Sequence, residues 1–290
     1  MISSHSSSQP RYYTNGGSAS RDVQGDATSS DGMLKLSARI NTFNEEDNIG
    51  AALESLAWAD ELVVVDSDST DRTVEIARRY TDRVISYPFR GYGDKHNHAD
   101  SLCSHEWVLT LDADERVTPE LRAAIQTVQR QGTDLDGFRI ARRTWYLDRW
   151  IRHSGWYPDY QARLYRRSCT RWEGESPHEA PKVSGRVGTL SGDMLHYTRR
   201  NLHEHLAVLN RYTDIAAEAR FQAGKRVSLA RLAFAPGATF LRSYVLKQGF
   251  RDGVPGLIIA YLAAYYVHVK DAKLIEKWRG AEPDDVSGLG

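Results

Sequence analysis

Short apolar runs recur at regular intervals through the first half of the chain. Five of them, at residues 34–40, 62–65, 83–86, 107–111 and 137–140, are of strand length and are rich in Val, Ile and Leu. Runs of this kind that are apolar throughout suit strands buried on both faces. The pattern therefore predicts five strands, of which those at 62–65 and 107–111 are buried on both faces.

Between these runs, apolar residues recur at helical spacing. Ile49, Leu53 and Leu56 predict a helix, and Asn44 is well placed to cap it because acidic residues follow directly. Further helices are predicted through residues 74–77, from Lys95 to Cys103, and after Thr118, where a cap residue precedes Pro119.

Strands that alternate with helices favour right-handed crossovers and a mostly parallel sheet with helices on both faces. This is the α/β class, and in such sheets ligands bind at the carboxyl ends of the strands.

The pattern changes after residue 142. Tryptophan, tyrosine and arginine crowd the chain as far as Trp172, and the loss of periodicity predicts a loop-rich cap with a few strands. A helix is predicted from Leu202 to Ala223. The boundaries predicted on this basis are a disordered tail over 1–32, a catalytic domain over 33–200 and a C-terminal helical region over 201–290.

The C-terminal region is basic and apolar. No acid stands between Glu218 and Asp252, and the run from Val254 to Val267 is apolar but shorter than the ~20 residues of a membrane span. Two interpretations stay open: a monotopic contact with anionic lipid, or a helical hairpin packed on the catalytic domain.

Composition narrows the range of functions. The chain has 290 residues with 41% hydrophobic and 26% charged residues and zero formal net charge, which disfavours nucleic acid as a partner. Two cysteines without a CxxC pair indicate neither a disulfide framework nor a zinc site, and they fit a reducing compartment. The Ser-rich first residues lack the apolar segment of a secretory signal.

Acidic loops follow two of the predicted strands. Asp112 and Asp114 come directly after a buried run, and two such carboxylates are oxygen ligands that suit Mg²⁺ or Mn²⁺ on a diphosphate. Asp66 and Asp68 end a neighbouring strand, where a carboxylate can accept hydrogen bonds from a base or ribose, or can cap a helix. No GxxxxGK[ST] loop is present, which disfavours a P-loop enzyme.

Three motifs in order resemble glycosyltransferase family 2: TFNEE at residues 42–46, VVDSDSTD at 64–71 and LDADE at 111–115. Downstream, WYPD at 156–159, RLYR at 163–166 and the pairs His178-Glu179 and His196-Tyr197 are similar to the lipopolysaccharide-core β-glucosyltransferase branch. The resemblance covers residues 34–278. Asn41 stands where that family usually has Pro, and Asp68 where it usually has Gly, a site at which positive φ is tolerated by Asp.

The resemblance implies a GT-A fold, an inverting mechanism and a UDP-sugar donor, with UDP-glucose as first choice. It implies a set of nucleotide-sugar contacts: Thr42, Phe43, Asn44, Glu45, Asp66, Asp68, Lys95, Asn97, Asp112 and Ala113. A divalent Mg²⁺ or Mn²⁺ would be held by Asp112 and Asp114, with His196 as a further ligand.

A one-step inversion needs a general base for the acceptor hydroxyl, and the resemblance favours Glu179 with Asp159 as runner-up. The implied acceptor is a cell-envelope glycan or glycolipid such as lipopolysaccharide core. The implied location is cytoplasmic, peripheral on the inner face of the cytoplasmic membrane. A polyprenyl-phosphate sugar synthase and a non-catalytic nucleotide-binding scaffold at the membrane surface are the alternatives.

Overall fold

The computed structural model describes residues 32–174, 180–198 and 201–280. Contacts divide the chain into two units. The first unit runs to Arg143 and resumes over Asp159–His196, and the helical unit joins Thr144–Pro158 to the chain from Tyr197 onward. The domain boundaries predicted from the sequence stay predictions, and the predicted tail over 1–32 lies outside the described residues except for Gly32.

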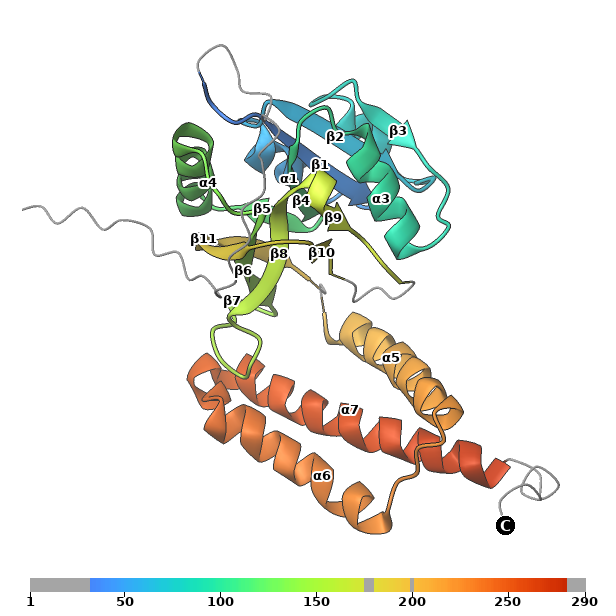
Figure 1. Cartoon of the computed structure of the whole chain (residues 1–290). Helices are drawn as coiled ribbons and strands as arrows, with labels where there is room; N and C mark the ends of the chain where they lie inside the picture. Colours follow the sequence, from blue (N-terminus) through green and yellow to red (C-terminus); the bar gives the residue numbers. More distant parts are fainter. Residues whose placement is uncertain (1–31, 175–179, 199–200, 281–290) are drawn as a thin grey trace, which may run out of the picture. The chain divides into compact units, whose positions relative to one another are not determined.

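The first unit is built on a mixed sheet with the strand order β3-β2-β1-β4-β8-β6-β11-β5 (Figure 1). Its first four strands are parallel: β3 (Val84–Ser86), β2 (Glu61–Asp66), β1 (Leu36–Thr42) and β4 (Trp107–Asp112). The predicted parallel arrangement holds for these strands. Beyond β4 the sheet is antiparallel, because β8 (Asp159–Arg166) runs against both β4 and β6 (Gly137–Tyr146). β11 (Val187–Tyr197) pairs antiparallel with β5 (Glu115–Val117).

Helices cover both faces of the parallel strands. α1 (Ile49–Leu56), α2 (Thr73–Ala77) and α4 (Pro119–Gln131) pack in one apolar core with Val64, and α3 (Tyr92–Leu102) packs in another with Val63 and Val65. Successive residues of one strand thus face opposite cores. This explains why the strand runs are apolar without alternation. A short pair, β9 (Thr170–Arg171) and β10 (Lys182–Val183), completes the first unit.

Of the two helix caps predicted from the sequence, the structure has one, at Thr118, and lacks the other, at Asn44. The Thr118 side chain accepts a hydrogen bond from the Leu121 amide at 3.2 Å and so caps α4, with Pro119 in the first turn. The predicted cap at Asn44 is wrong. α1 begins at Ile49, and Asn44 has a φ of 52° and accepts from the Thr70 amide at 2.8 Å. The Asn44 side chain therefore joins two loops through this hydrogen bond and does not cap a helix.

The few strands predicted after residue 142 are present, but they belong to the main sheet and not to a cap. β6 continues to Tyr146 and Asp159–Arg166 forms β8, so arginine-rich sequence lies inside the sheet. Arg163, Leu164 and Tyr165 are consecutive buried residues of β8, which a count of aromatic and basic residues does not reveal.

The helical unit contains three long helices. They are α5 (Leu202–Gln222), α6 (Leu229–Leu241) and α7 (Gly253–Gly280), and α6 and α7 lie side by side (Figure 1). Asp271 of α7 is fully buried and pairs with Arg220 of α5 at 2.5 Å and Arg231 of α6 at 2.9 Å. One carboxylate therefore joins all three helices. The segment Gly249–Gly280 is long and apolar enough to cross a membrane by length and composition alone.

Candidate active site

The carboxyl ends of three neighbouring parallel strands bring the acidic loops together. Thr42 of β1 is in register with Asp66 of β2, and Asn41 is in register with Asp112 of β4. Asp66 and Asp112 therefore flank the end of β1, although 46 residues separate them in the sequence. The sequence predicted both acidic loops at the carboxyl ends of neighbouring parallel strands, and the structure places β1 between those two strands.

The Asp66 side chain is fixed by the loop that follows it. One carboxylate oxygen accepts from the Ser69 amide at 2.9 Å and the other from the Ser69 hydroxyl at 2.5 Å. Asp66 is 2% exposed. Asp68, two residues on, adopts a φ of 60° and accepts from the Ser86 hydroxyl at 2.8 Å. The backbone thus turns at Asp68 in the left-handed region, where Gly would be more comfortable.

The TFNEE segment meets the same loop. The Asn44 amide donates to the Ser69 hydroxyl at 2.8 Å, and the Glu45 amide donates to the Thr73 hydroxyl at 2.7 Å. The Glu45 carboxylate accepts from the Asn48 side chain at 2.9 Å. Phe43, in contrast, is 56% exposed at the end of β1. Asn44 and Glu45 therefore shape the loop, whereas the Phe43 ring remains accessible to a ligand.

Lys95 brings a buried positive charge to this edge. Its ammonium donates to the Thr42 carbonyl at 3.0 Å, and the side chain is largely buried on α3. Burial lowers the pKa of Lys95 from 10.5 to about 8, while the nearby Asp66 and Asp112 carboxylates act in the opposite direction. The structure therefore places one buried positive charge near the carboxylates of Asp66 and Asp112.

Asp112 and Glu115 share one arginine. A single Arg163 nitrogen donates to Asp112 Oδ2 at 2.7 Å and to Glu115 Oε1 at 2.7 Å, and Glu115 Oε2 accepts from the Asp112 amide at 3.0 Å. Desolvation opposes ionisation of Asp112, but the Arg163 guanidinium holds the pKa of Asp112 well below its usual range. Burial raises the pKa of Glu115, which is fully enclosed. The Asp112 side chain is 41% exposed, so it keeps an accessible edge.

Asp114 faces a histidine from the far strand. Asp114 Oδ2 lies 3.2 Å from His196 Nε2, and both side chains are partly exposed. β11 pairs with β5 so that His196 is in register with Glu115. Within the described residues, no group of three or more His, Cys, Asp and Glu side chains is arranged to hold a metal. Mg²⁺ in nucleotide sites typically takes one or two carboxylates and completes its shell with phosphates and water, so this donor set fits such an ion.

A buried polar network lies beneath the edge. Arg39 is fully enclosed and donates to Asp100 at 2.7 Å and to the Tyr165 hydroxyl at 3.0 Å, and it contacts His96 Nδ1 at 2.9 Å. Burial, together with the Arg39 charge, lowers the pKa of His96 to about 2, so the imidazole is neutral. The His96 ring stacks on Trp172 with 3.8 Å between ring centroids.

The side chain of Asn97, next to His96 on α3, already has hydrogen-bond partners. Its amide nitrogen donates to the Trp172 carbonyl at 2.8 Å, and its oxygen accepts from the Trp172 amide at 3.0 Å. These two bonds hold the main chain just ahead of residues 175–179. The structure thus gives Asn97 an anchoring contact, and its predicted contact with the nucleotide stays a prediction.

Of the two candidates for the general base, Glu179 and Asp159, the structure describes only Asp159. Glu179 lies outside the described residues. Asp159 begins β8, where one carboxylate oxygen accepts from Arg142 at 2.7 Å and the other from Gln161 at 2.8 Å. Both oxygens of the runner-up already have partners. Ala113, between the two acids of the LDADE motif, is 4% exposed and packs into the core.

The sequence analysis quoted Glu115 and Arg163 within motifs but predicted neither their pairing nor the role of Arg39. Each is a buried charged residue on a strand, and its oppositely charged partner stands at least 48 residues away in the sequence. A buried strand position is the signal that could have identified them, since a charge there needs a partner. Arg163 follows Ala162 and precedes Leu164 on β8 and is 6% exposed.

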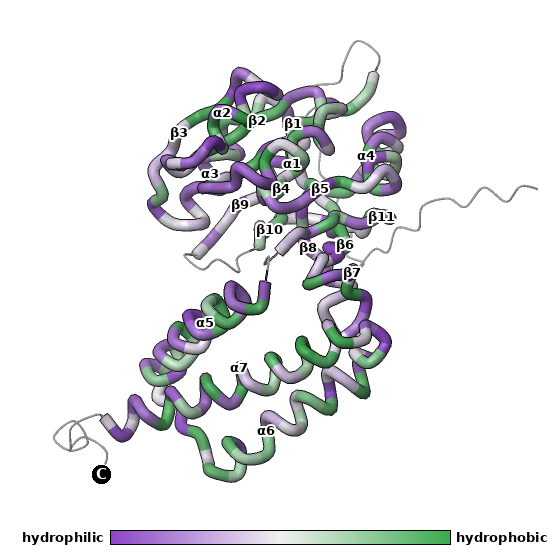
Figure 2. The backbone as a smooth tube through the Cα atoms, turned by 180° about the vertical axis from the view of Figure 1, so that it is seen from behind, coloured by the Kyte–Doolittle hydropathy of each residue, from purple (hydrophilic) through white to green (hydrophobic). Residues whose placement is uncertain are grey.

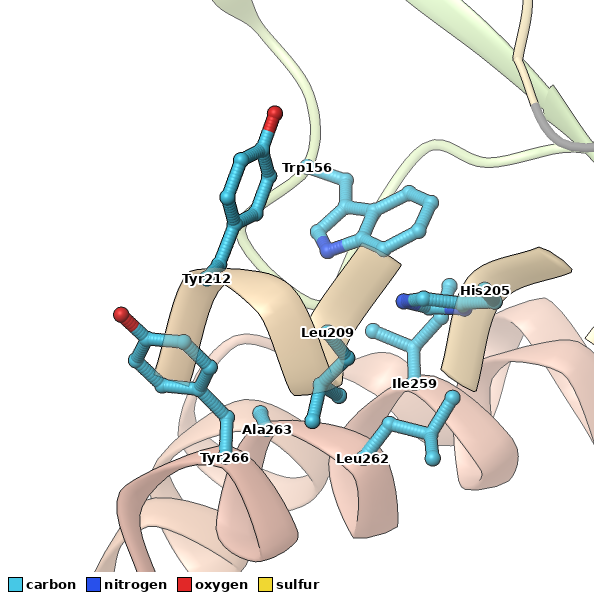
Figure 3. Close-up of a pocket in the computed structure, with 8 residues that line it drawn as sticks. All are labelled: Trp156, His205, Leu209, Tyr212, Ile259, Leu262, Ala263 and Tyr266. Atoms are coloured by element: carbon cyan, nitrogen blue, oxygen red, sulfur yellow. The ribbon is translucent and has the colours of Figure 1, made fainter. Parts of the chain in front are cut away.

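A separate small cavity of about 160 Å³ lies in the helical unit. Figure 3 shows its lining, which comes from α5, α7 and the loop that carries Trp156: Trp156, His205, Leu209, Tyr212, Ile259, Leu262, Ala263 and Tyr266. Nδ1 of the buried His205 is hydrogen-bonded to the Tyr146 hydroxyl at 2.7 Å. No carboxylate belongs to this lining, so the cavity lacks the acidic groups that gather at the strand ends of the first unit.

A mixed sheet with helices on both faces and acidic side chains at its parallel strand ends is the architecture of a GT-A glycosyltransferase. The family model for glycosyl transferase family 2 matches residues 37–184. The chain therefore belongs to glycosyltransferase family 2, and the fold class predicted from its motifs is confirmed.

Relatives extend the match beyond the family region. The chain is 32% identical over 251 residues to the lipopolysaccharide core biosynthesis glycosyltransferase LpsC of Rhizobium meliloti, covering 84% of this chain and 93% of LpsC. An uncharacterized glycosyltransferase of Rickettsia typhi is 28% identical over 84% of this chain and 88% of its own. Among solved structures, Staphylococcus aureus TarS 1–349 with UDP-GlcNAc aligns at 19% identity with a TM-score of 0.46, covering 86% of this chain and 93% of the other.

Proposed function

We propose that this glycosyltransferase moves a hexose, glucose being our first choice, from a UDP-sugar to a hydroxyl group of a cell-envelope glycan or glycolipid. Lipopolysaccharide core is the acceptor that the similarity to LpsC favours. The observation that carries the proposal is the gathering of Asp66, Lys95 and Asp112 at adjoining strand ends. A carboxylate pair around a cation suits a ligand that has both a polar base and a diphosphate.

The nucleoside would bind at the ends of β1 and β2. Asp66 is rigid and retains acceptor sites on its carboxylate, so it suits the uracil N–H group. The exposed Phe43 ring offers an apolar face to the base, and Thr42 lines the same pocket. Asp68 and the Asn44-Glu45 pair support this pocket through the loop contacts rather than from within it.

The ribose and diphosphate would extend toward β4. The accessible edge of Asp112 suits ribose hydroxyls, while Lys95 offers its charge to the phosphates. Asp114 and His196 would hold Mg²⁺ or Mn²⁺. When bound, such an ion neutralises the negative charge that develops on the departing UDP.

Arg163 has a positioning role in this proposal. It neutralises Asp112 and Glu115 together and fixes the turn from which Asp114 projects, because Glu115 also accepts from the Asp112 amide. Ala113 packs inward and lets the two flanking acids project outward. Without the guanidinium, two carboxylates would repel each other at the head of the motif.

The transfer itself would be a single inverting displacement. The acceptor hydroxyl loses its proton to the carboxylate of Glu179, its oxygen forms a bond to the anomeric carbon, and the bond from that carbon to the UDP oxygen breaks. Asp159 is the second choice of base, since both of its oxygens already accept hydrogen bonds. Because the acceptor is tied to the envelope, the enzyme would work in the cytoplasm at the inner face of the cytoplasmic membrane.

The test is a donor screen with Mn²⁺ and an envelope lipid extract as acceptor. We expect sugar incorporation from UDP-glucose in preference to UDP-galactose and UDP-N-acetylglucosamine, and we expect Glu179→Gln to abolish transfer while UDP still binds. Asp134→Asn is a matched control, because Asp134 is an exposed acid away from the strand ends. Transfer to a polyprenyl phosphate instead would favour the synthase alternative, and UDP binding with neither transfer nor hydrolysis would favour a scaffold.

A further inference from the structure

α6 is apolar on the side that it exposes. None of its residues is buried, and the exposed fraction of the side chains reaches 76% at Phe234 and 58% at Leu241. Residues 232–241 contain one polar side chain, Thr239, whose hydroxyl donates to the Ala235 carbonyl at 2.8 Å within the helix. A helix at a water-facing surface normally has a charged or polar outer face, which α6 lacks.

The apolar surface continues through the π-helical turn Arg242–Leu246 that follows α6. Leu246 is 77% exposed, and Phe250 and Val254 beyond it are also exposed. Figure 2 shows hydrophobic colouring along much of α6 and again at the start of α7, with polar positions between them. Exposed apolar residues gathered in this way indicate a covering partner.

Positive charges stand at both ends of α6. The interval from 219 to 251 contains no acid. Within it, Arg220 and Arg231 are paired with Asp271 of α7. The remaining cations at the two ends are all exposed: Lys225 and Arg226 before α6, and Arg242, Lys247 and Arg251 after it. This excess of positive charge selects an anionic partner.

We propose that α6 with its π-helical turn, the α6 face, lies flat in the interface of an anionic membrane as a monotopic anchor, and that α7 is its support and does not span. The inference extends the proposed function, whose glycolipid acceptor would be met at this surface. A flat orientation keeps the cations at both ends in the headgroup layer, whereas insertion of the α6–α7 turn would carry Arg242, Lys247 and Arg251 into hydrocarbon.

The packing of α7 explains why it supports rather than spans. Pro255, Gly256, Ile259 and Ala260 are buried within the helical unit, and the backbone of Gly256 packs closely against the Gly249 carbonyl, where a side chain would not fit. The second half of α7 carries the buried Asp271 with its two arginine partners. If α7 spanned a membrane, its buried residues would face lipid and Asp271 would lose its arginine partners.

A second copy of the chain is the other partner that could cover an apolar face. Two α6 faces in contact would bring two sets of cations together without an acid in the interval to compensate them. Like charges across an interface oppose association. The charge pattern therefore favours lipid over self-association.

Flotation of the full chain with vesicles tests the proposal. We expect binding to phosphatidylcholine vesicles that contain phosphatidylglycerol, weaker binding to phosphatidylcholine alone, and a loss on the order of 100-fold in partitioning for Phe234→Ser with Leu241→Ser. Ile215→Ser on α5 is the matched control, since Ile215 is 55% exposed in the same unit. Equal partitioning of the double variant and the control would overturn the proposal, as would a dimer by sedimentation that the double variant abolishes without any vesicle binding.

The depth of insertion separates an anchor from a span. A fluorophore is attached through Phe234→Cys in a Cys169→Ser background, because the native thiol that remains, Cys103, is buried. We expect quenching by lipids that carry the quencher near the headgroup, and no such quenching of a label at Ile215→Cys. A label at Ala264→Cys quenched at the bilayer centre would overturn the supporting role of α7. UDP-sugar hydrolysis, followed in parallel without lipid, reports on the proposed function separately.

Discussion

The first unit and the helical unit both bury ion pairs, but they differ in the apolar surface that they expose. The first unit encloses Arg39, Glu115 and Arg163 and pairs each with an oppositely charged side chain of another element. The helical unit buries the ion-paired Asp271 and yet leaves Phe234 and Leu246 mostly exposed, with further cations at the ends of α6. Buried ion pairs hold a reactive edge in one geometry, whereas exposed apolar surface indicates that a partner completes the structure.

The largest expected effect comes from removing the guanidinium that joins Asp112 and Glu115. Arg163→Met should lower the free energy of unfolding by about 3–5 kcal/mol, because it leaves two carboxylates without their shared partner. Denaturant unfolding measures the loss. Arg139→Met on the neighbouring strand β6 is the control, since Arg139 is exposed, and equal losses in the two variants would contradict the account.

In the proposed function Asp114 holds the metal on the diphosphate, so Asp114→Asn should lower turnover by about 10²–10³-fold. Stability should change little, because the Asp114 side chain is partly exposed and its charged neighbour, His196, is partly exposed too. Steady-state transfer with Mn²⁺ measures the turnover, with Asp134→Asn alongside. If Asp114→Asn lowers the free energy of unfolding as much as Arg163→Met does, Asp114 has a structural role and the account is contradicted.

The pH dependence of UDP affinity sharpens the role of Lys95. Its pKa of about 8 means that the ammonium is charged below pH 8 and neutral above it, so affinity should fall by roughly tenfold per pH unit above 8. Titration calorimetry at a series of pH values measures this. Lys95→Arg should remove the fall, since arginine stays charged; an unchanged profile in that variant would assign the pH dependence to another group.

The same pKa shift has a consequence for stability. The folded chain binds the Lys95 proton less tightly than the unfolded chain, whose lysine titrates near 10.5. This group therefore makes the free energy of unfolding rise with pH between about 8 and 10.5. Comparison of the wild type with Lys95→Met over that range isolates the contribution.

The smallest effect is expected in the helical unit. Asp252 is 3% exposed and accepts from the Arg152 and His153 amides and from the His153 ring. Asp252→Asn should lower the free energy of unfolding by about 1 kcal/mol, since the amide retains only part of these bonds. UDP affinity should stay at the wild-type value. A loss of UDP affinity would show that the two units do not act separately in donor binding.

Local and parallel features were predictable from the sequence. The strands of the parallel half, the Thr118 cap and the meeting of Asp66 with Asp112 follow from apolar runs, helix-end residues and the geometry of parallel strands. The family match rested on three motifs in order, and it is confirmed. The roles of the site residues stay predictions, and Glu179 lies outside the described residues.

Long-range antiparallel pairing was not predictable from these signals. Arg163 joins Asp112 across 51 residues only because β8 runs beside β4, and Arg39 joins Asp100 across 61 residues. Asn44 looked like a helix cap because its local sequence is typical of one, but contacts with Thr70 and Ser69 hold it in a loop. Each miss concerns a polar side chain whose partner was chosen by the tertiary structure.

The most direct test of the central claim is calorimetric titration of UDP into the purified chain with and without Mn²⁺, repeated with Asp66→Ala. The account predicts uptake of one UDP per chain that is strengthened by Mn²⁺ and lost in the variant, because Asp66 and the metal-facing acids serve one ligand. The absence of UDP uptake by the wild type, or full uptake by Asp66→Ala, would contradict it.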